Sequence, residues 1–129
     1  NFANPDMVAH TAKIKPTIVG LELVDTCIGK IVDLVLAKEG VVFITADHGN
    51  AEEMINLQTG EALKDHSTNP VPFIAVGKIW EGQTGNLPEG VGPDLSLVSP
   101  GGILSDVAPT VLKVLNIKPP PEMTGAPLI

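Results

Sequence analysis

The sequence contains no arginine, and all eight of its basic residues are lysines. Arginine binds carboxylates and phosphates through two parallel hydrogen bonds, whereas lysine acts as a point charge. The chain is therefore poorly equipped to bind a phosphorylated anion with its own cations. If its function involves phosphate, we expect metal ions to hold the phosphate, or arginines that lie outside these 129 residues.

A second cysteine, a long apolar run and a positive net charge are also absent. Cys27 is the only cysteine, so it forms no intramolecular disulfide, which favours a cytoplasmic location. We expect it to be buried on a helix as a small apolar residue. No apolar run approaches the roughly 18–20 residues of a membrane span, and the net charge of −7 argues against binding to a nucleic-acid backbone. We therefore expect neither a membrane nor a nucleic-acid partner.

The apolar content is high enough for a folded core. Hydrophobic residues make up 43% of the sequence and charged residues 18%, which disfavours disorder. A length of 129 residues suits one compact α/β unit. Because the sequence begins at Asn1 without a methionine, and its first residues have the pattern of a strand, we expect it to be a piece of a longer protein.

Hydrophobic spacing predicts a strand, a helix and a second strand in the first part of the chain. Residues 1–6 have the pattern of a buried strand that runs into a loop. Between residues 16 and 38, apolar side chains recur every three or four positions, as on one face of a helix, and Gly40 is expected to end that helix. Residues 41–46 (VVFITA) form a continuous run rich in β-branched residues, typical of a strand buried on both faces. This order predicts a right-handed βαβ crossover.

Shorter elements follow. Residues 54–62 are expected to form a hairpin, residues 72–76 a third strand, and residues 80–102 a long surface excursion rich in glycine and proline. Ser105 is expected to N-cap a last helix, whose apolar face comprises Val107, Val111, Val114 and Leu115. The predicted fold class is therefore α/β.

All three histidines lie close to carboxylates in short polar strings. Asp6 and His10 are four residues apart, so on a helical turn they would share one face. Asp47 and His48 follow the strand predicted at 41–46, and His66 precedes the next strand. Since open α/β sheets bind ligands at the carboxyl ends of their strands, we expect the three strings to converge at one edge of the sheet.

Carboxylate oxygens combined with imidazole nitrogens favour Mn²⁺ or Zn²⁺ over Mg²⁺ and Ca²⁺. These five ligands are too many for one tetrahedral ion with an open position and too few for two ions. The count therefore predicts a two-metal site completed by groups from elsewhere, which can clamp a phosphoryl group during its transfer. Each string alone has an ordinary explanation, as a surface pair, a turn or a polar loop, but their joint occurrence favours metal.

Three strings carry a resemblance to a known family. Residues 1–11 (NFANPDMVAHT), 44–54 (ITADHGNAEEM) and 66–74 (HSTNPVPFI) closely resemble the cofactor-independent phosphoglycerate mutases. Residues 104–112 and 122–129 fit the end of that family's sequence. The likeness covers nearly all of this chain but only the C-terminal part of the family's protein. The Asp-His-Gly string alone recurs throughout the alkaline phosphatase superfamily.

The resemblance implies an alkaline-phosphatase-like sheet flanked by helices, of which residues 1–129 would be the C-terminal portion of the metal-binding domain. The nucleophile segment and an inserted substrate-binding domain would be absent. It implies interconversion of 3-phosphoglycerate and 2-phosphoglycerate in glycolysis through a phosphoserine enzyme, with two Mn²⁺ ions and without 2,3-bisphosphoglycerate. Asp6, His10 and His66 would bind one ion, and Asp47 and His48 the other, beside an aspartate and the nucleophilic serine of an earlier segment.

This chain would then contain no catalytic residue of its own, and by itself it would be inactive and inclined to self-associate through uncovered apolar surface. Thr11, Ser67 and Thr68 lie beside the ligand histidines. We expect their hydroxyls to hydrogen-bond and orient those histidines rather than to replace the missing serine. The family usually has glycines around the first histidine, where this chain has Ala9 and Ala12, and the added methyl groups bear on the placement of His10.

Two other interpretations stay open at this point. One is a phosphopentomutase or a phosphatase of the same superfamily, which sequence upstream of Asn1 would distinguish. The other is a non-catalytic interaction module, which would bind no transition metal.

Overall fold

The computed structural model describes residues 1–83 and 98–129. The chain divides into two compact units, Asn1–Thr84 and Gly85–Ile129, which are described separately. The predicted surface excursion at 80–102 falls largely outside the described residues.

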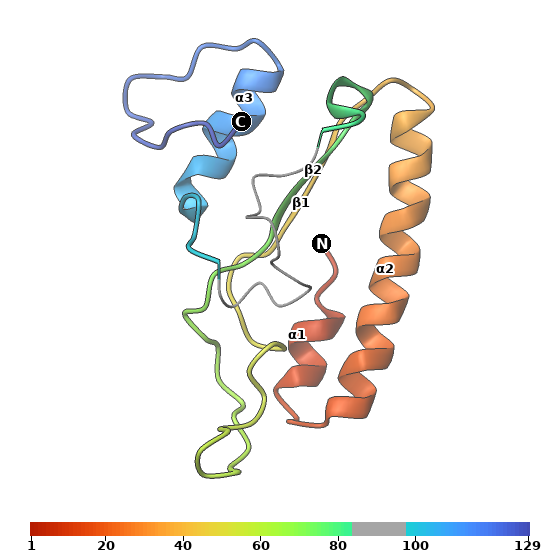
Figure 1. Ribbon diagram of the computed structural model, residues 1–129, viewed down its shortest axis with the longest axis vertical. Helices are drawn as coiled ribbons and strands as arrows, with labels where there is room; N and C mark the ends of the chain where they lie inside the picture. The colour runs from red at the N-terminus through yellow and green to blue at the C-terminus, as the bar shows by residue number, and fades with distance from the viewer. Residues whose placement is uncertain (84–97) are drawn as a thin grey trace. The chain divides into compact units, whose positions relative to one another are not determined.

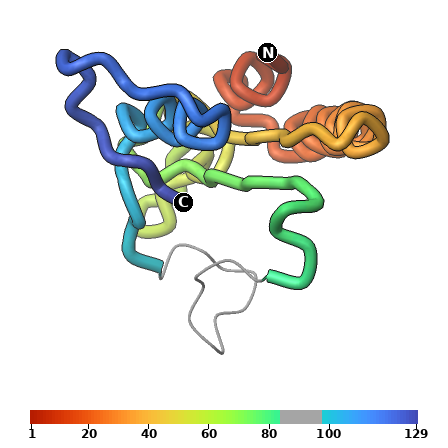
Figure 2. Tube along the Cα trace, turned by 90° about the horizontal axis from the view of Figure 1, so that it is seen from above, coloured from red at the N-terminus to blue at the C-terminus, as the bar shows by residue number. Residues whose placement is uncertain are grey.

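The first unit begins with two helices that lie side by side (Figures 1 and 2). Helix α1 spans Asn4–Ala9 and helix α2 spans Ile14–Leu36. The second helix confirms the predicted helical spacing and begins two residues before the expected start at Pro16. Its end differs in detail: Glu39 has the positive φ of 57°, and the N–H of Gly40 donates to the carbonyl of Val35.

The strand predicted at residues 1–6 is wrong, because residues 4–9 form α1 and residues 1–3 belong to no strand. Pro5 lies in the first turn of α1, where its missing N–H costs no intrahelical hydrogen bond. Asp6 also lies in that turn, where a negative charge is stabilised by the helix dipole. These two residues favour a helix start over a strand end.

The sheet of the described residues consists of strands β1 (Val42–Thr45) and β2 (Phe73–Val76). They pair antiparallel, with Val42 opposite Val76 and Thr45 opposite Phe73. The predicted βαβ crossover is not found, because residues 1–6 form no strand and none therefore precedes α2. Burial of β1 on both faces is also wrong, because its residues are half-buried or exposed.

The hairpin predicted at 54–62 is confirmed in outline. Ile55 and Ala62 form an antiparallel bridge, and the N–H of Leu63 donates to the carbonyl of Met54 at 2.9 Å. Gly60 turns the chain with a φ of 73°, which glycine adopts at little cost. Met54 is 6% exposed and anchors the hairpin.

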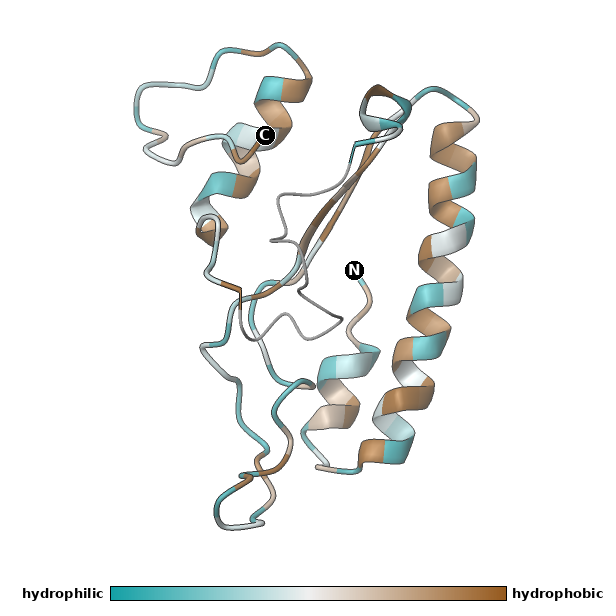
Figure 3. Cartoon of the chain, in the orientation of Figure 1, coloured by the Kyte–Doolittle hydropathy of each residue, from teal (hydrophilic) through white to brown (hydrophobic). Residues whose placement is uncertain are grey.

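Hydrophobic and hydrophilic residues alternate along helix α2 (Figure 3), and several of its large apolar residues are exposed. Ile18, Leu23 and Leu34 are 48%, 59% and 66% exposed, while its buried residues are Thr17 and Gly20. Cys27 is exposed, so its predicted burial is wrong. A helix buries only the surface that another element covers. Less of the α2 surface is covered than its pattern of apolar residues predicts.

In the part of the chain that the structure describes, no helix is long and apolar enough to cross a membrane.

The second unit contains a short 3-10 helix η3 (Leu104–Asp106) that leads into helix α3 (Val107–Val114). The predicted last helix is thus present, but Ser105 is not its N-cap. Asp106 occupies that position, and its carboxylate accepts from the N–H of Ile103 and of Ala126, each at 2.9 Å. The carboxylate therefore fastens the C-terminal segment to the start of α3.

Thr110 forms a second connection to the C-terminal segment. Its side chain is fully buried, and its hydroxyl donates to the carbonyl of Asp106 at 2.6 Å and accepts from the N–H of Leu128 at 2.9 Å. Both hydrogen-bonding capacities of the hydroxyl are used within this unit. Thr110, which lies in one of the strings that resemble the family's C-terminal sequence, thus has a structural role.

Replacement of Thr110 by valine is expected to destabilise the chain by about 1–2 kcal/mol, because the N–H of Leu128 loses its acceptor while it stays largely shielded from water. Urea denaturation followed by circular dichroism measures this. Thr26→Val is the matched control, since the Thr26 hydroxyl also donates to a carbonyl four residues earlier but is exposed. Equal losses in the two variants would contradict the role assigned to Thr110.

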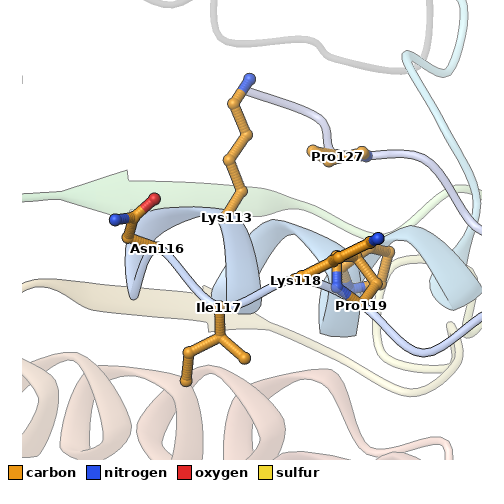
Figure 4. A pocket seen from close by; sticks show the side chains of 7 residues that line it. Lys113, Asn116, Ile117, Lys118, Pro119 and Pro127 are labelled. Carbon is orange, nitrogen blue, oxygen red and sulfur yellow. The ribbon is translucent and has the colours of Figure 1, made fainter.

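A pocket of about 330 Å³ lies beside α3 (Figure 4). It is lined by Pro109, Lys113, Asn116, Ile117, Lys118, Pro119 and Pro127. The described lining residues include two lysines but no histidine or carboxylate, so this pocket offers no ligand set for a transition metal. The chemistry-bearing side chains lie in the first unit instead.

Candidate metal centre

Helix α1 delivers the first two candidate ligands to the site. Asp6 and His10 lie one turn apart, and Nε2 of His10 is 3.4 Å from Oδ2 of Asp6. The other ring nitrogen, Nδ1, hydrogen-bonds the carbonyl oxygen of Lys64 at 2.5 Å. Because a carbonyl only accepts, Nδ1 carries the proton in the neutral imidazole, and the lone pair of that form lies on Nε2. The imidazole of His10 is thus oriented as a ligand.

Helix α1 ends at Ala9, and the chain turns within the next three residues. Ala9 is fully buried, and Ala12 has a φ of 53°, in the left-handed region that favours glycine. Ala12 thus has a positive φ, a conformation suited to the glycines that the similar family usually has around this histidine. The added methyl groups nevertheless leave His10 within the site.

His48 and His66 come from the segments that follow β1 and precede β2. These segments pair through a bridge between Gly49 and Ser67, with the N–H of Ser67 donating to the carbonyl of Gly49 at 2.8 Å. The rings of His48 and His66 stack with their centroids 3.7 Å apart. The antiparallel bridge, which lies beyond the end of β1 and before the start of β2, therefore brings both histidines together.

Four of the five predicted ligands lie close to one another. Nε2 of His66 is 3.5 Å from Oδ1 of Asp6 and 3.2 Å from Nε2 of His10. Ligand atoms of Asp6, His48 and His66 all lie within 4.8 Å of one another. Carboxylate and imidazole donors at such separations fit a divalent transition metal.

Asp47 stands apart from this group. Its side chain is 86% exposed, and its nearest candidate partner is its neighbour His48, whose Nε2 is 3.7 Å from Oδ2 of Asp47. His48 therefore lies between two groupings: with Asp47, as the resemblance implies, or with Asp6 and His66, as their mutual distances allow.

Asn50 is a site residue that sequence reasoning missed. It is 5% exposed, and its Nδ2 donates to Oδ1 of Asp6 at 2.7 Å and lies 3.4 Å from Nε2 of His10. This hydrogen bond lowers the pKa of the Asp6 carboxyl; partial desolvation opposes the shift, and His10, His66 and His48 add to it. Asp6 is therefore ionised at neutral pH, as a candidate metal ligand should be. The signal in the sequence was its place two residues after His48, in the same polar string as two candidate ligands.

Glu52 is a second missed residue. Burial raises the pKa of its carboxyl, but hydrogen bonds from Ser67, from its own backbone, from Asn69 and from Asn50 outweigh that effect, so the pKa is lowered. Glu52 therefore carries a negative charge that is satisfied by several donors from both segments of the site.

The hydroxyls expected to orient the histidines make other contacts. The Thr11 hydroxyl donates to the carbonyl of Val8 at 2.7 Å, and the Ser67 hydroxyl donates to Glu52. Thr68 is exposed. Orientation of His10 comes instead from the Lys64 carbonyl, a backbone group that carries no signal in the sequence.

Comparison with known proteins narrows the family. A model of the metalloenzyme superfamily matches residues 1–119. The chain is 46% identical over all its 129 residues to a 2,3-bisphosphoglycerate-independent phosphoglycerate mutase of Clostridioides difficile, of which it covers 23%. It is 49% identical over the same length to a mutase of Clostridium botulinum, of which it covers 22%. It is 48% identical to that of Nostoc punctiforme, of which it covers 23%.

A solved structure agrees. The chain is similar to the crystal structure of Leishmania mexicana phosphoglycerate mutase at low cobalt concentration, with a TM-score of 0.70 and 30% sequence identity. The match covers 98% of this chain and 23% of that one. The chain thus spans about a quarter of the length of these relatives and matches a part of the alkaline-phosphatase-like mutase fold. Together with the cluster of carboxylate and imidazole ligands, these matches show that the chain belongs to the metalloenzyme superfamily and is similar within it to the cofactor-independent phosphoglycerate mutases.

Proposed function

We propose that this chain forms part of the metal-binding domain of a phosphoglycerate mutase that interconverts 3-phosphoglycerate and 2-phosphoglycerate in glycolysis without 2,3-bisphosphoglycerate. One observation supports this most: Asp6, His10 and His66, from sequence-distant strings, lie together in a chain 46–49% identical to such mutases. The cysteine usage favours a cytoplasmic location for it.

The ligand set suits Mn²⁺, with Zn²⁺ as the other metal of the same preference. Asp6, His10 and His66 would hold one ion, and Asp47 and His48 would contribute to the second. When bound, the two ions neutralise the charge of a phosphoryl group during its transfer. The residues of this chain bind and orient the metals, and the serine that would carry the phosphoryl group belongs to a part of the enzyme outside residues 1–129.

The absence of arginine supports the same division of labour. A phosphoglycerate carries a carboxylate and a phosphate, both of which arginine binds well, and this chain has only lysines. Substrate recognition is therefore assigned to other parts of the enzyme. We expect the 129-residue chain alone to show no mutase turnover.

A chimeric enzyme tests the proposal. In it, this chain replaces the matching segment of the Clostridioides difficile mutase, to which it is 46% identical. We expect a soluble enzyme that converts 3-phosphoglycerate to 2-phosphoglycerate with added Mn²⁺ and loses that activity on treatment with a chelator. A coupled assay through enolase measures the product.

A second chimera distinguishes the proposed mutase function from that of a phosphopentomutase. The matched control places this chain in the corresponding part of a phosphopentomutase, where we expect no pentose phosphate turnover. A folded, metal-loaded mutase chimera without phosphoglycerate turnover would contradict the proposed function. Activity of the pentose chimera alone would replace it with the phosphopentomutase.

A further inference from the structure

The backbones of the segments that carry His48 and His66 pair at one place. Among the described residues, the Gly49–Ser67 bridge joins them through one backbone hydrogen bond, from the N–H of Ser67 to the carbonyl of Gly49. One backbone hydrogen bond between two loop segments sets their distance at that point but does not by itself fix their mutual rotation. A further constraint is needed to hold two imidazoles in one orientation toward a shared ion.

The Glu52 carboxylate supplies that constraint. One of its oxygens, Oε2, accepts from the backbone N–H of Asn50 at 2.7 Å. The other, Oε1, accepts from the hydroxyl of Ser67 and from Nδ2 of Asn69, the latter at 3.1 Å. The carboxylate thus spans both segments, one residue beyond Gly49 on one side and directly at the bridge on the other. Its acceptors lie against Gly49, where an added Cβ would overlap both the Ser67 hydroxyl and the Glu52 carboxylate.

The same connection reaches the ligands of α1. Asn50, whose backbone N–H is held by Glu52, donates from its side chain to Oδ1 of Asp6. A single charged side chain is therefore linked to all three ligand-bearing segments: to His48 through the backbone of Asn50, to His66 through Ser67, and to Asp6 through the Asn50 amide.

On the basis of the proposed function, we propose that Glu52 is a positioning residue of the metal centre, which holds the His48 and His66 segments in the relative orientation that metal binding requires. It is not itself a ligand. Its oxygens face Asn50, Ser67 and Asn69, and the group of mutually close ligand atoms among the described residues consists of Asp6, His48 and His66. Its negative charge matters because charge-assisted hydrogen bonds are stronger than neutral ones.

The test is a comparison of Glu52→Ala with Glu53→Ala. Glu53 is the adjacent carboxylate and also accepts from Nδ2 of Asn69, at 2.9 Å, but within the described part of the chain its carboxylate forms no hydrogen bond with Asn50 or Ser67. Titration of the full chain with Mn²⁺, followed by the electron paramagnetic resonance signal of the free ion, gives the dissociation constant. We expect Glu52→Ala to raise it by about 10–100-fold, the usual effect of removing a partner that orients metal ligands. Glu53→Ala should leave it unchanged.

Loading the chain with Co²⁺ in place of Mn²⁺ gives a second measurement. It would not change if Glu52 only stabilised the fold. The visible absorption of Co²⁺ reports the geometry of the bound ion, which we expect to change in Glu52→Ala and to be partly restored in Glu52→Gln, which keeps one acceptor oxygen. Should Glu52→Ala fail to fold, Glu52→Gln and Ser67→Ala carry the test, each with a smaller loss of affinity. An unchanged dissociation constant and spectrum in the folded Glu52 variants, or an equal loss in Glu53→Ala, would overturn the proposal.

Failure of the positioning role is distinguishable from failure of the proposed function. If the unsubstituted chain and Glu53→Ala bind no Mn²⁺ at all, the metal site itself is refuted, and Glu52 has nothing to position. If the unsubstituted chain binds Mn²⁺ and Glu52→Ala binds it as tightly, the metal site stands and only the role of Glu52 is lost.

Discussion

Replacement of His66 by alanine is expected to raise the Mn²⁺ dissociation constant of this chain by more than about 100-fold, beyond the 10–100-fold effect of losing a partner that merely orients a ligand. The reason is its central position: Nε2 of His66 lies 3.5 Å from Oδ1 of Asp6 and 3.2 Å from Nε2 of His10, and its ring stacks on that of His48. Both candidate sets of ligands that include Asp6 also include His66, so its removal takes one donor from either set. Calorimetric titration and the metal content of the purified protein measure the loss.

Asp65→Asn provides the control for this substitution. Asp65 is the exposed neighbour of His66 and is not among the mutually close ligand atoms. It should bind Mn²⁺ as the unsubstituted chain does. Retention of full affinity by His66→Ala would show that the cluster of histidines is not a metal site, and would leave the non-catalytic interaction module as the better account of the chain.

Replacement of Gly49 by alanine is expected to destabilise the chain by about 3 kcal/mol, at the upper end of the usual cost of overpacking. A Cβ at this position would overlap the Ser67 hydroxyl and the Glu52 carboxylate at the same time. These two side chains would have to move and give up the hydrogen bond that joins the His48 and His66 segments, so metal affinity should fall together with stability. Urea denaturation gives the first quantity and Mn²⁺ titration the second.

Gly29→Ala is the control for a glycine that needs no such space. It lies within α2, and nothing lies within 4 Å of an added Cβ. Alanine is the better helix former, so this variant should gain up to about 1 kcal/mol. If Gly49→Ala behaved like Gly29→Ala, the close approach of Glu52 and Ser67 at the bridge would be wrong.

Local sequence patterns predicted the elements that depend on local forces. The apolar spacing of residues 16–38 identified α2, and the pattern of residues 54–62 identified the hairpin, because helix periodicity and turn formation depend on the local sequence. The pattern did not predict the pairing of β1 with β2 or the exposure of Cys27. Strand direction and burial depend on which other segments cover an element, and a run of apolar residues does not specify its neighbours.

At the candidate metal centre, the sequence by itself determined the kinds of ligand and the four-residue spacing that places Asp6 and His10 on one helical face. Only the tertiary structure decided how those ligands meet: through the antiparallel bridge at Gly49, the backbone carbonyl of Lys64, and the side chains of Asn50 and Glu52. The physical reason is that a ligand's identity is a property of one residue. Its orientation is set by hydrogen bonds between segments 15 or more residues apart, as between Glu52 and Ser67.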